Sequence, residues 1–344
     1  MKIIYIFLVF TFLSFHSFAQ YLTNEGENYD KFNKGYNQYL HNTGVDSNSL
    51  GNATLHNEYY YFYKALHAKI GVFDAGFYFN HEDIKNTVKR GTNEIHYHGT
   101  LVAGIISAEA SNGKGYRGII DTKYTYGLYH KEKGSSWSKI NSYVKSLCGA
   151  FNIFNISLDL ENTSFRQSGN NYNEIKHIKN IQKWRTLINS SECKNTMFIV
   201  AAGNSDVDAK KDMGSLHYQY VNNSVVYNPL DNLIIVGSIK NGKISENYGE
   251  SVDIYAPDSV AGPYKHENGN STYTKYQSGT SFTAPQVTAA VGAVLKSYII
   301  MKPKDIKEYI LNKANLSRIT DINGYSRPIL NTYQIIDKVY KDRH

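Results

Sequence analysis

The sequence lacks several features that would assign it to other classes of protein. It contains only 2 cysteines, 6 prolines and 2 tryptophans in 344 residues. It has no long basic run and no arginine cluster interleaved with aromatic residues, so the formal net charge of +7 does not indicate nucleic-acid recognition. We expect this charge to lie on a general solvated surface. No internal repeat or low-complexity linker interrupts the chain, which favours one continuous domain.

The N-terminal apolar run is too short for a comfortable membrane span. It extends from Ile3 to Phe15, follows Lys2 and precedes the small-x-small cleavage signal Ser17-Phe18-Ala19. This pattern predicts a signal peptide over residues 1–19, with an uncleaved anchor as the alternative. No cysteine follows the run, so a lipidated N-terminus is not supported. We therefore predict a secreted or periplasmic protein with no stable membrane span after signal removal.

The rest of the chain divides into an extension and one large domain. Residues 20–66 are rich in Tyr, Asn and Gly and show no sustained apolar periodicity until Tyr59, so we interpret them as an N-terminal extension. From Lys69 onward apolar runs alternate with helical patterns, which is typical of a parallel sheet covered by helices. We predict an α/β domain over residues 67–344, with three layers: a mostly parallel β-sheet and helices on both of its faces.

The predicted elements alternate regularly along the domain. Strands are expected at residues 69–73, 124–128, 151–156, 197–201 and 233–236. Helices are expected at residues 98–108, 138–147, 174–188, 281–300, 304–312 and 332–340.

The two cysteines hold equivalent places in this pattern. Cys148 lies before the apolar run 151–156, and Cys193 lies before the run 197–201. If these runs are neighbouring parallel strands, both sulfurs lie near one edge of the sheet and can pair in an oxidising compartment. The alternative is two separate buried thiols.

A hydroxyl among small residues opens the most apolar helix. In Ser278-Gly279-Thr280-Ser281-Phe282-Thr283-Ala284-Pro285, a nucleophilic serine would occupy position 281. The N-terminus of the following helix would direct unpaired N–H groups towards an anion formed there. We expect Pro285 in the first helical turn, where its missing N–H costs nothing. The alternative is that Gly-Thr-Ser is only a loop and helix cap.

Two other segments supply the partners that such a serine needs. An apolar strand ends at Asp74, before the turn Ala75-Gly76, and His98-Gly99-Thr100 begins a helix. A serine hydroxyl requires a base to take its proton, and a carboxylate can hold that base in the correct tautomer. Alone, the aspartate could form a turn and the histidine a cap.

These three motifs, in the order Asp74, His98, Ser281, resemble the subtilisin-like (subtilase) serine peptidase family. The resemblance extends from about residue 67 to the C-terminus. It implies the three-layer fold, polypeptide substrates and an acyl-enzyme on Ser281, with no cofactor required for the chemistry. It also implies that Asn204, at the end of the strand-like segment 198–205, donates to the oxyanion together with the N–H of Ser281.

The resemblance also indicates where a substrate would bind. It identifies Ser157, Leu158 and Asp159 with one side of a groove, and Ala202 and Gly203 with the wall of the specificity pocket. An extended peptide would add there as a strand. Asp159 stands where the family commonly has glycine. Its side chain would narrow the groove or favour a basic substrate residue.

The sequence assigns no metal. His96 and His98 lack the third ligand and the helical pattern of a zinc site. Relatives frequently bind structural calcium, but no loop here has a definite pattern of oxygen ligands. The sequence indicates no oligomeric state.

Two other functional classes are alternatives to a peptidase. A catalytically silent surface or binding protein with the same fold is the principal alternative, although the intact motifs oppose it. An esterase of the α/β-hydrolase type is disfavoured because Gly-x-Ser-x-Gly is absent around Ser281.

Overall fold

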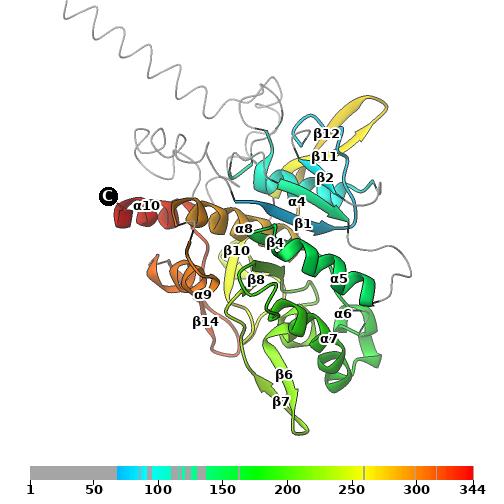
Figure 1. The fold of residues 1–344 in the computed structure, drawn as a ribbon, viewed down its shortest axis with the longest axis vertical. Coiled ribbons are helices and arrows are strands. Elements are labelled where there is room, and N and C mark those ends of the chain that lie inside the picture. The colour runs from blue at the N-terminus through cyan, green and yellow to red at the C-terminus, as the bar shows by residue number, and fades with distance from the viewer. Residues whose placement is uncertain are drawn as a thin grey trace, which may run out of the picture.

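A computed structural model describes residues 68–84, 87–90, 95–109, 115, 118–120, 125–129, 137–161, 163–258, 260–298, 300–314 and 316–343. The predicted signal peptide and N-terminal extension lie outside these residues. The described part of the chain is built on an 8-stranded sheet with the order β10-β8-β5-β4-β1-β3-β2, and β9 pairs with β8 (Figure 1). The strands are β1 (Ile70–Asp74), β2 (Val88–Arg90), β3 (Thr125–Tyr129), β4 (Ile153–Ile156), β5 (Met197–Ala201), β8 (Leu233–Lys240), β9 (Lys243–Ile244) and β10 (Ile254–Pro257).

The strands of this path pair in parallel, and β9 alone among the described strands of the sheet is antiparallel. Parallel pairing places the carboxyl ends of the strands along one edge of the sheet. The segments after Asp74, Ile156 and Ala201 therefore leave the sheet at the same edge. All five predicted strands are present, and residues 197–201 match their predicted bounds.

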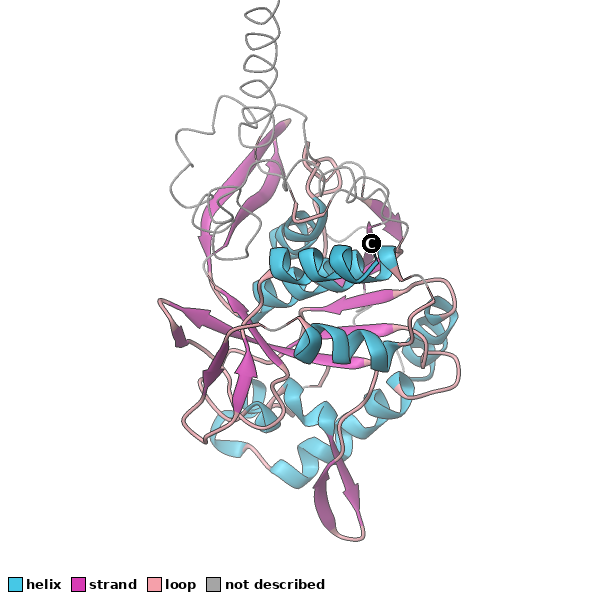
Figure 2. Ribbon diagram, turned by 90° about the vertical axis from the view of Figure 1, so that its left-hand side faces the viewer, coloured by secondary structure: helices cyan, strands magenta, loops and turns pink. Residues whose placement is uncertain are grey.

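Helices cover both faces of the sheet (Figure 2). They are α4 (Tyr97–Ser107), α5 (Trp137–Cys148), α6 (Phe165–Ser168), α7 (Glu174–Ile188), α8 (Thr280–Ser297), α9 (Pro303–Glu308) and α10 (Thr332–Arg343). Short 3-10 turns occupy Gly169–Asn171, Ala209–Lys211 and Met213–His217, and a π-helical turn, Tyr309–Lys313, follows α9.

The sheet separates two apolar cores. Along β5, Ile199 packs with the core under α4 and α8, whereas Phe198 and Val200 pack with the core under α5 and α7. This alternation follows from the two-residue period of a strand, and burial of both faces explains why β5 is apolar throughout.

Several elements were not predicted. They include the short helix α6, the strands β2, β9 and β10, and three antiparallel hairpins: β6 (Tyr218–Val221) with β7 (Ser224–Tyr227), β11 (Val260–Glu267) with β12 (Asn270–Gln277), and β13 (Arg318–Thr320) with β14 (Ser326–Pro328). The β6–β7 and β11–β12 hairpins extend away from the central sheet (Figure 1). Most residues of these strands are at least partly exposed, and the strands mix Tyr with polar residues such as Gln, Ser, Thr and Lys, so they lack the apolar runs that identify a buried strand.

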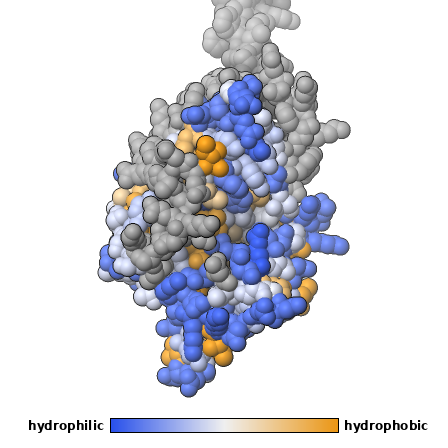
Figure 3. All heavy atoms as spheres, turned by 90° about the vertical axis from the view of Figure 1, so that its right-hand side faces the viewer, coloured by the Kyte–Doolittle hydropathy of each residue, from blue (hydrophilic) through white to orange (hydrophobic). Residues whose placement is uncertain are grey.

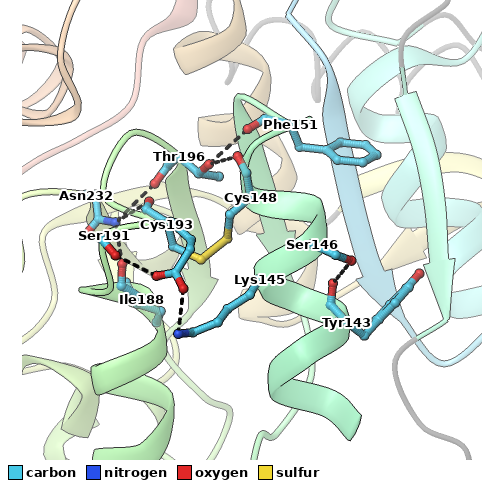
Figure 4. The surroundings of a disulfide bond; sticks show 11 residues. Tyr143, Lys145, Ser146, Cys148, Phe151, Ile188, Ser191, Cys193, Thr196 and Asn232 are labelled. Carbon is cyan, nitrogen blue, oxygen red and sulfur yellow. Dashed lines mark hydrogen bonds and ion pairs between the residues drawn. A yellow bond between two sulfur atoms is a disulfide. The ribbon is translucent and has the colours of Figure 1, made fainter.

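The expected disulfide is confirmed between Cys148 and Cys193 (Figure 4). It joins the C-terminus of α5 to the turn after α7, close to the starts of β4 and β5. The hydroxyl of Thr196 donates to the carbonyls of Cys148 and Phe151 at 2.7 and 3.0 Å. The side-chain amide of Asn232 donates to the carbonyls of Ile188, Cys193 and Thr196 at 2.9–3.2 Å.

The face in Figure 3 is mostly hydrophilic, with apolar residues in small separate groups. Small apolar groups of this kind are ordinary on a protein surface. Among the described residues, no helix is long and apolar enough to cross a membrane.

Candidate active site

Asp74 and His98 meet at the carboxyl edge of the sheet. Asp74 is the last residue of β1 and is fully buried, and its Oδ1 lies 2.7 Å from Nδ1 of His98. The backbone N–H of Ala75 donates to the same oxygen at 2.7 Å. Since Nδ1 faces the carboxylate, Nε2 of His98 is the ring nitrogen left to accept a proton.

The close approach of α4 to β1 depends on a glycine. A Cβ on Gly99 would lie 2.3 Å from the carbonyl oxygen of Gly76 and 3.0 Å from Cβ of Asp74. His96 is the N-cap of α4, and its Nδ1 accepts from the N–H of His98 at 3.1 Å. His96 therefore has a structural role in positioning His98.

The pKa of His98 is set by two opposing effects. Burial disfavours the charged imidazolium and lowers the pKa, whereas the charge and the hydrogen bond of Asp74 raise it. The positive charge of Arg166 also lowers the pKa of His98. The net effect raises the pKa of His98 above its ordinary value of 6.5.

Ser281 lies near the start of α8, as predicted, but the helix begins one residue earlier, at Thr280. Pro285 is the sixth residue of this helix and lies beyond its first turn, so our expectation that it occupies the first turn was wrong. The missing N–H of Pro285 deprives the carbonyl of Ser281 of its helical donor. This carbonyl instead accepts from the hydroxyl of Ser157 at 2.9 Å.

The hydroxyl of Ser281 is held only loosely. Its Oγ lies 3.3 Å from the carbonyl oxygen of Ser157, which is long for a bond between a hydroxyl and an oxygen. The neighbouring Phe282 packs against His98 with ring centroids 5.0 Å apart, so the imidazole lies beside the start of α8. Among the described residues, Nε2 of His98 makes no hydrogen bond, and catalytic contacts commonly tighten only when substrate binds.

Asn204 has a defined amide orientation. Its Oδ1 accepts from the N–H of Thr280 at 2.7 Å and from the hydroxyl of Thr280 at 2.8 Å. Two donors identify this atom as the oxygen, so Nδ2 is available as a donor. Gly279 leaves room for this amide: it has a φ of 125°, and a Cβ there would lie 3.2 Å from Nδ2.

A buried carboxylate holds the loop before the serine. Asp258 accepts from the hydroxyl of Ser278 at 2.6 Å and from the N–H of Gly279 at 2.9 Å. Asp258 and Asn204 thus hold this loop from two sides. The N-terminus of α8 is thereby fixed relative to β5.

The segment 157–159 follows β4 directly and flanks Ser281. Ser157 is buried, and Leu158 and Asp159 are partly exposed. Asp159 Oδ2 accepts from the side-chain amide of Gln167 at 2.9 Å. Burial raises the pKa of Asp159, the bond from Gln167 lowers it, and the negative charge of Asp212 raises it further.

Ala202 and Gly203 follow β5 and are both buried. The space behind Gly203 is filled, because a Cβ there would lie 2.6 Å from Oδ2 of Asp212 and 2.4 Å from Nδ2 of Asn247. Asp212 is fully buried and accepts from the N–H of Arg166 at 3.2 Å and from Asn247 at 2.7 Å. No local sequence pattern identifies Asp212, which lies between the 3-10 turns Ala209–Lys211 and Met213–His217.

A second serine–histidine contact lies elsewhere, in the interior. His177 Nε2 lies 2.9 Å from Oγ of Ser215, and both residues are buried. The hydroxyl of Ser215 donates to the carbonyl of Asp212 at 2.6 Å, so Ser215 accepts from His177. The hydroxyl of Thr163 lies 3.1 Å from Nδ1 and can donate to it. A histidine that donates through Nε2 is no base for this serine, so the contact is structural.

The described residues contain no group of three or more His, Cys, Asp or Glu side chains arranged to hold a metal ion. The possibility of structural calcium and the expectation that the chemistry needs no cofactor both stay predictions.

A family model described as the subtilase family matches residues 66–332. Subtilisin-like protease 2 of Trichophyton equinum is 26% identical over 259 residues, which cover 70% of this chain and 53% of that protein. The epidermin leader peptide-processing serine protease EpiP of Staphylococcus epidermidis is 24% identical over 332 residues, covering 78% of this chain and 69% of that protein. The chain thus spans about half the length of the Trichophyton relatives that it matches.

Solved structures show the same architecture. A protease of Pseudoalteromonas arctica PAMC 21717 is 17% identical with a TM-score of 0.61, covering 92% of this chain and 99% of its own. The A-subunit of the AB5 toxin from E. coli is 13% identical with a TM-score of 0.62, covering 88% of this chain and 98% of its own. The nisin leader peptidase NisP from Lactococcus lactis is 18% identical with a TM-score of 0.58, covering 88% and 94%. At these identities the likeness establishes the fold alone, and it confirms the predicted α/β architecture.

Proposed function

Because the chain belongs to the subtilase family, we propose that it is a serine endopeptidase that cleaves polypeptides through an acyl-enzyme on Ser281. The observation that carries this proposal is the 2.7 Å contact between Asp74 and His98, at the sheet edge beside the start of α8. A buried carboxylate, an imidazole with one free ring nitrogen and a loosely held hydroxyl are the groups that nucleophilic acyl transfer requires.

The first half of the reaction transfers the acyl group to the enzyme. Oγ of Ser281 attacks the carbonyl carbon of the scissile peptide while Nε2 of His98 takes the hydroxyl proton. Asp74 stabilises the resulting imidazolium through Nδ1. His98 then gives the proton to the leaving amine as the C–N bond breaks, which leaves an ester on Ser281.

The second half regenerates the enzyme. His98 takes a proton from water, the water oxygen attacks the ester carbon, and Ser281 recovers its proton from His98 as the ester bond breaks. In both halves the carbonyl oxygen gains negative charge, for which Nδ2 of Asn204 and the N–H of Ser281 are suitable donors. Loss of such a side-chain donor costs on the order of 10²–10³ in kcat, a range that comes from subtilisin.

The substrate would add as a strand beside residues 157–159, where β4 has left its ladder with β1 and β5. The ladders end at Ile156. An extended peptide there can form main-chain hydrogen bonds with the released segment. Ala202 and Gly203 would face the substrate from the end of β5.

Export is proposed together with this activity. The pattern over residues 1–19 supports a signal peptide, and the Cys148–Cys193 disulfide supports an oxidising compartment. These two observations support a periplasmic or extracellular location.

Labelling with a fluorophosphonate tests the proposed nucleophile. We expect the purified full chain to be modified at Ser281, and Ser281→Ala to remain unmodified. Ser215→Ala is the matched control, because Ser215 also contacts a histidine, and it should label like the wild type. If the folded wild-type protein stays unmodified at Ser281, the catalytically silent alternative is favoured. N-terminal sequencing of the active form would show whether residues 1–19 or 20–66 are removed.

A further inference from the structure

Pro285 creates a need for a hydrogen-bond donor beneath the nucleophile. In an α-helix the N–H of each residue donates to the carbonyl four residues earlier. Pro285 lies four residues after Ser281 within α8 and has no N–H to donate. A buried carbonyl without a donor is destabilising, so the protein must satisfy the carbonyl of Ser281 from outside the helix.

A chain of three buried side chains supplies this donor. The hydroxyl of Ser157 donates to the carbonyl of Ser281 at 2.9 Å, and the side-chain amide of Asn155 donates to Oγ of Ser157 at 3.0 Å. The hydroxyl of Thr288 donates in turn to Oδ1 of Asn155 at 2.9 Å. The hydroxyl of Thr288 also lies 3.1 Å from the carbonyl of Ala284, which is the longer of its two contacts.

Asn155 occupies a position that the fold would otherwise fill with an apolar residue. It lies within β4 and is fully buried, as is Thr288 on α8. Two residues earlier on the same face, Ile153 belongs to the apolar core under α8. Because an amide buried in such a core is costly unless it is hydrogen-bonded, its chain to Ser281 accounts for a polar residue here.

Ser157 holds Ser281 at two points. Its hydroxyl donates to the carbonyl of Ser281, and its own carbonyl lies 3.3 Å from Oγ of Ser281. The backbone bond is short and buried, whereas the contact to the hydroxyl is long. The backbone of the nucleophile is thus fixed while its hydroxyl stays free to turn towards His98.

We propose that Thr288, Asn155 and Ser157 form a positioning relay that fixes the backbone of Ser281 for attack. The inference rests on the proposed peptidase function. Small displacements of a nucleophile cost rate because attack requires aligned atoms at close approach. Loosening the relay should therefore slow acylation while leaving substrate binding almost unchanged.

Substitution of Thr288 tests the relay with little change in shape. Thr288→Val keeps the volume but removes the donor to Asn155, and we expect kcat and the rate constant of fluorophosphonate labelling to fall by roughly five- to tenfold with KM within twofold. Thr288→Ser keeps the hydroxyl and should restore both rates. Ser157→Ala, which removes the last donor, should reduce both rates at least as much.

Thr196 provides the matched control. It is also buried and donates to two backbone carbonyls, but it lies at the opposite end of β5, beside the disulfide (Figure 4). Thr196→Val should lower the melting temperature and leave kcat unchanged.

The outcomes separate the relay from the peptidase proposal. If the wild type labels at Ser281 and both Thr288→Val and Ser157→Ala keep wild-type rates, the relay is overturned and the peptidase proposal stands. If Thr196→Val slows labelling as much as Thr288→Val, the effect is one of general stability and the relay is again overturned. If the wild type does not label at all, both proposals fall.

Discussion

The carboxylate of Asp74 and the imidazole of His98 share a hydrogen bond of 2.7 Å at a buried position, and this pair determines how activity should depend on pH. In the proposed mechanism, His98 must be neutral to accept the proton of Ser281. Its raised pKa means that protonation, and with it loss of activity, should already occur above pH 6.5, its ordinary value.

We therefore predict that kcat/KM rises with pH through a midpoint above 6.5. Asp74→Asn removes the negative charge that raises the pKa of His98, whereas burial still lowers this pKa. The midpoint should therefore move to lower pH. Activity at high pH should fall on the order of 10⁴-fold, because the imidazolium is no longer stabilised. The pH profile of both proteins, measured with a peptide ester substrate, checks this. A midpoint that does not move in Asp74→Asn would contradict the assignment of His98 as the base.

Gly279 should be required for the orientation of the Asn204 amide. An alanine at φ 125° is strained, and its Cβ would lie 3.2–3.4 Å from the amide atoms of Asn204. We predict that Gly279→Ala lowers kcat by about tenfold or more, with a smaller change in KM. Gly242 has a φ of 73° and open space around it, so Gly242→Ala carries the backbone strain without the clash. If both variants lose kcat equally, backbone strain explains the loss, and a displacement of Asn204 does not.

Asp159 should determine a preference for basic substrate residues. Asp159 is the last residue of the segment 157–159 that flanks Ser281, and the carboxylate of Asp212 lies near enough to raise the pKa of Asp159. We predict that a peptide-library profile of the wild type favours Lys or Arg, and that Asp159→Asn reduces this preference by roughly 10- to 100-fold in relative kcat/KM. The preference should strengthen as pH rises through the raised pKa of Asp159, because only the ionised carboxylate attracts a cation.

The control for Asp159 is Glu192, an exposed carboxylate paired with Lys145 far along the chain from the site. Glu192→Gln should leave the profile unchanged. A wild-type profile without basic preference, unaltered in Asp159→Gly, would remove the hypothesis.

The sequence singled out the candidate site residues on β1, α4 and α8 because each is marked by its immediate neighbours. Asp74 ends an apolar strand, His98 precedes a glycine that packs closely, and Ser281 opens an apolar helix. The place of Pro285 was mispredicted because position 285 lies beyond the first turn of a helix that begins at residue 280 or at residue 281, so in both cases the carbonyl of Ser281 lacks its helical donor.

Contacts between distant segments could not be predicted in this way. Ser157 contacts Ser281 across 124 residues, and Asn155 contacts Thr288 across 133 residues. Only the packing of α8 against β4 brings these residues together. The β11–β12 hairpin also lacks a local signal, because its register is interrupted by irregularities that break the alternation of a strand. The signal that could have found the relay is a polar residue, Asn155, within an otherwise apolar strand.

The Cys148–Cys193 disulfide should contribute strongly to stability. It closes a loop with a sequence separation of 45 residues, for which the chain-entropy relation gives about 4 kcal/mol of unfolding free energy. We predict that the double variant Cys148→Ala, Cys193→Ala unfolds at lower denaturant concentration than the wild type. A reductant should lower the stability of the wild type and leave that of the double variant unchanged. Equal unfolding curves for the wild type with and without reductant, after confirmed reduction of both thiols, would contradict a stabilising role. Because the disulfide lies at the amino ends of β4 and β5 and the catalytic groups lie at the carboxyl edge, the folded double variant should keep its kcat.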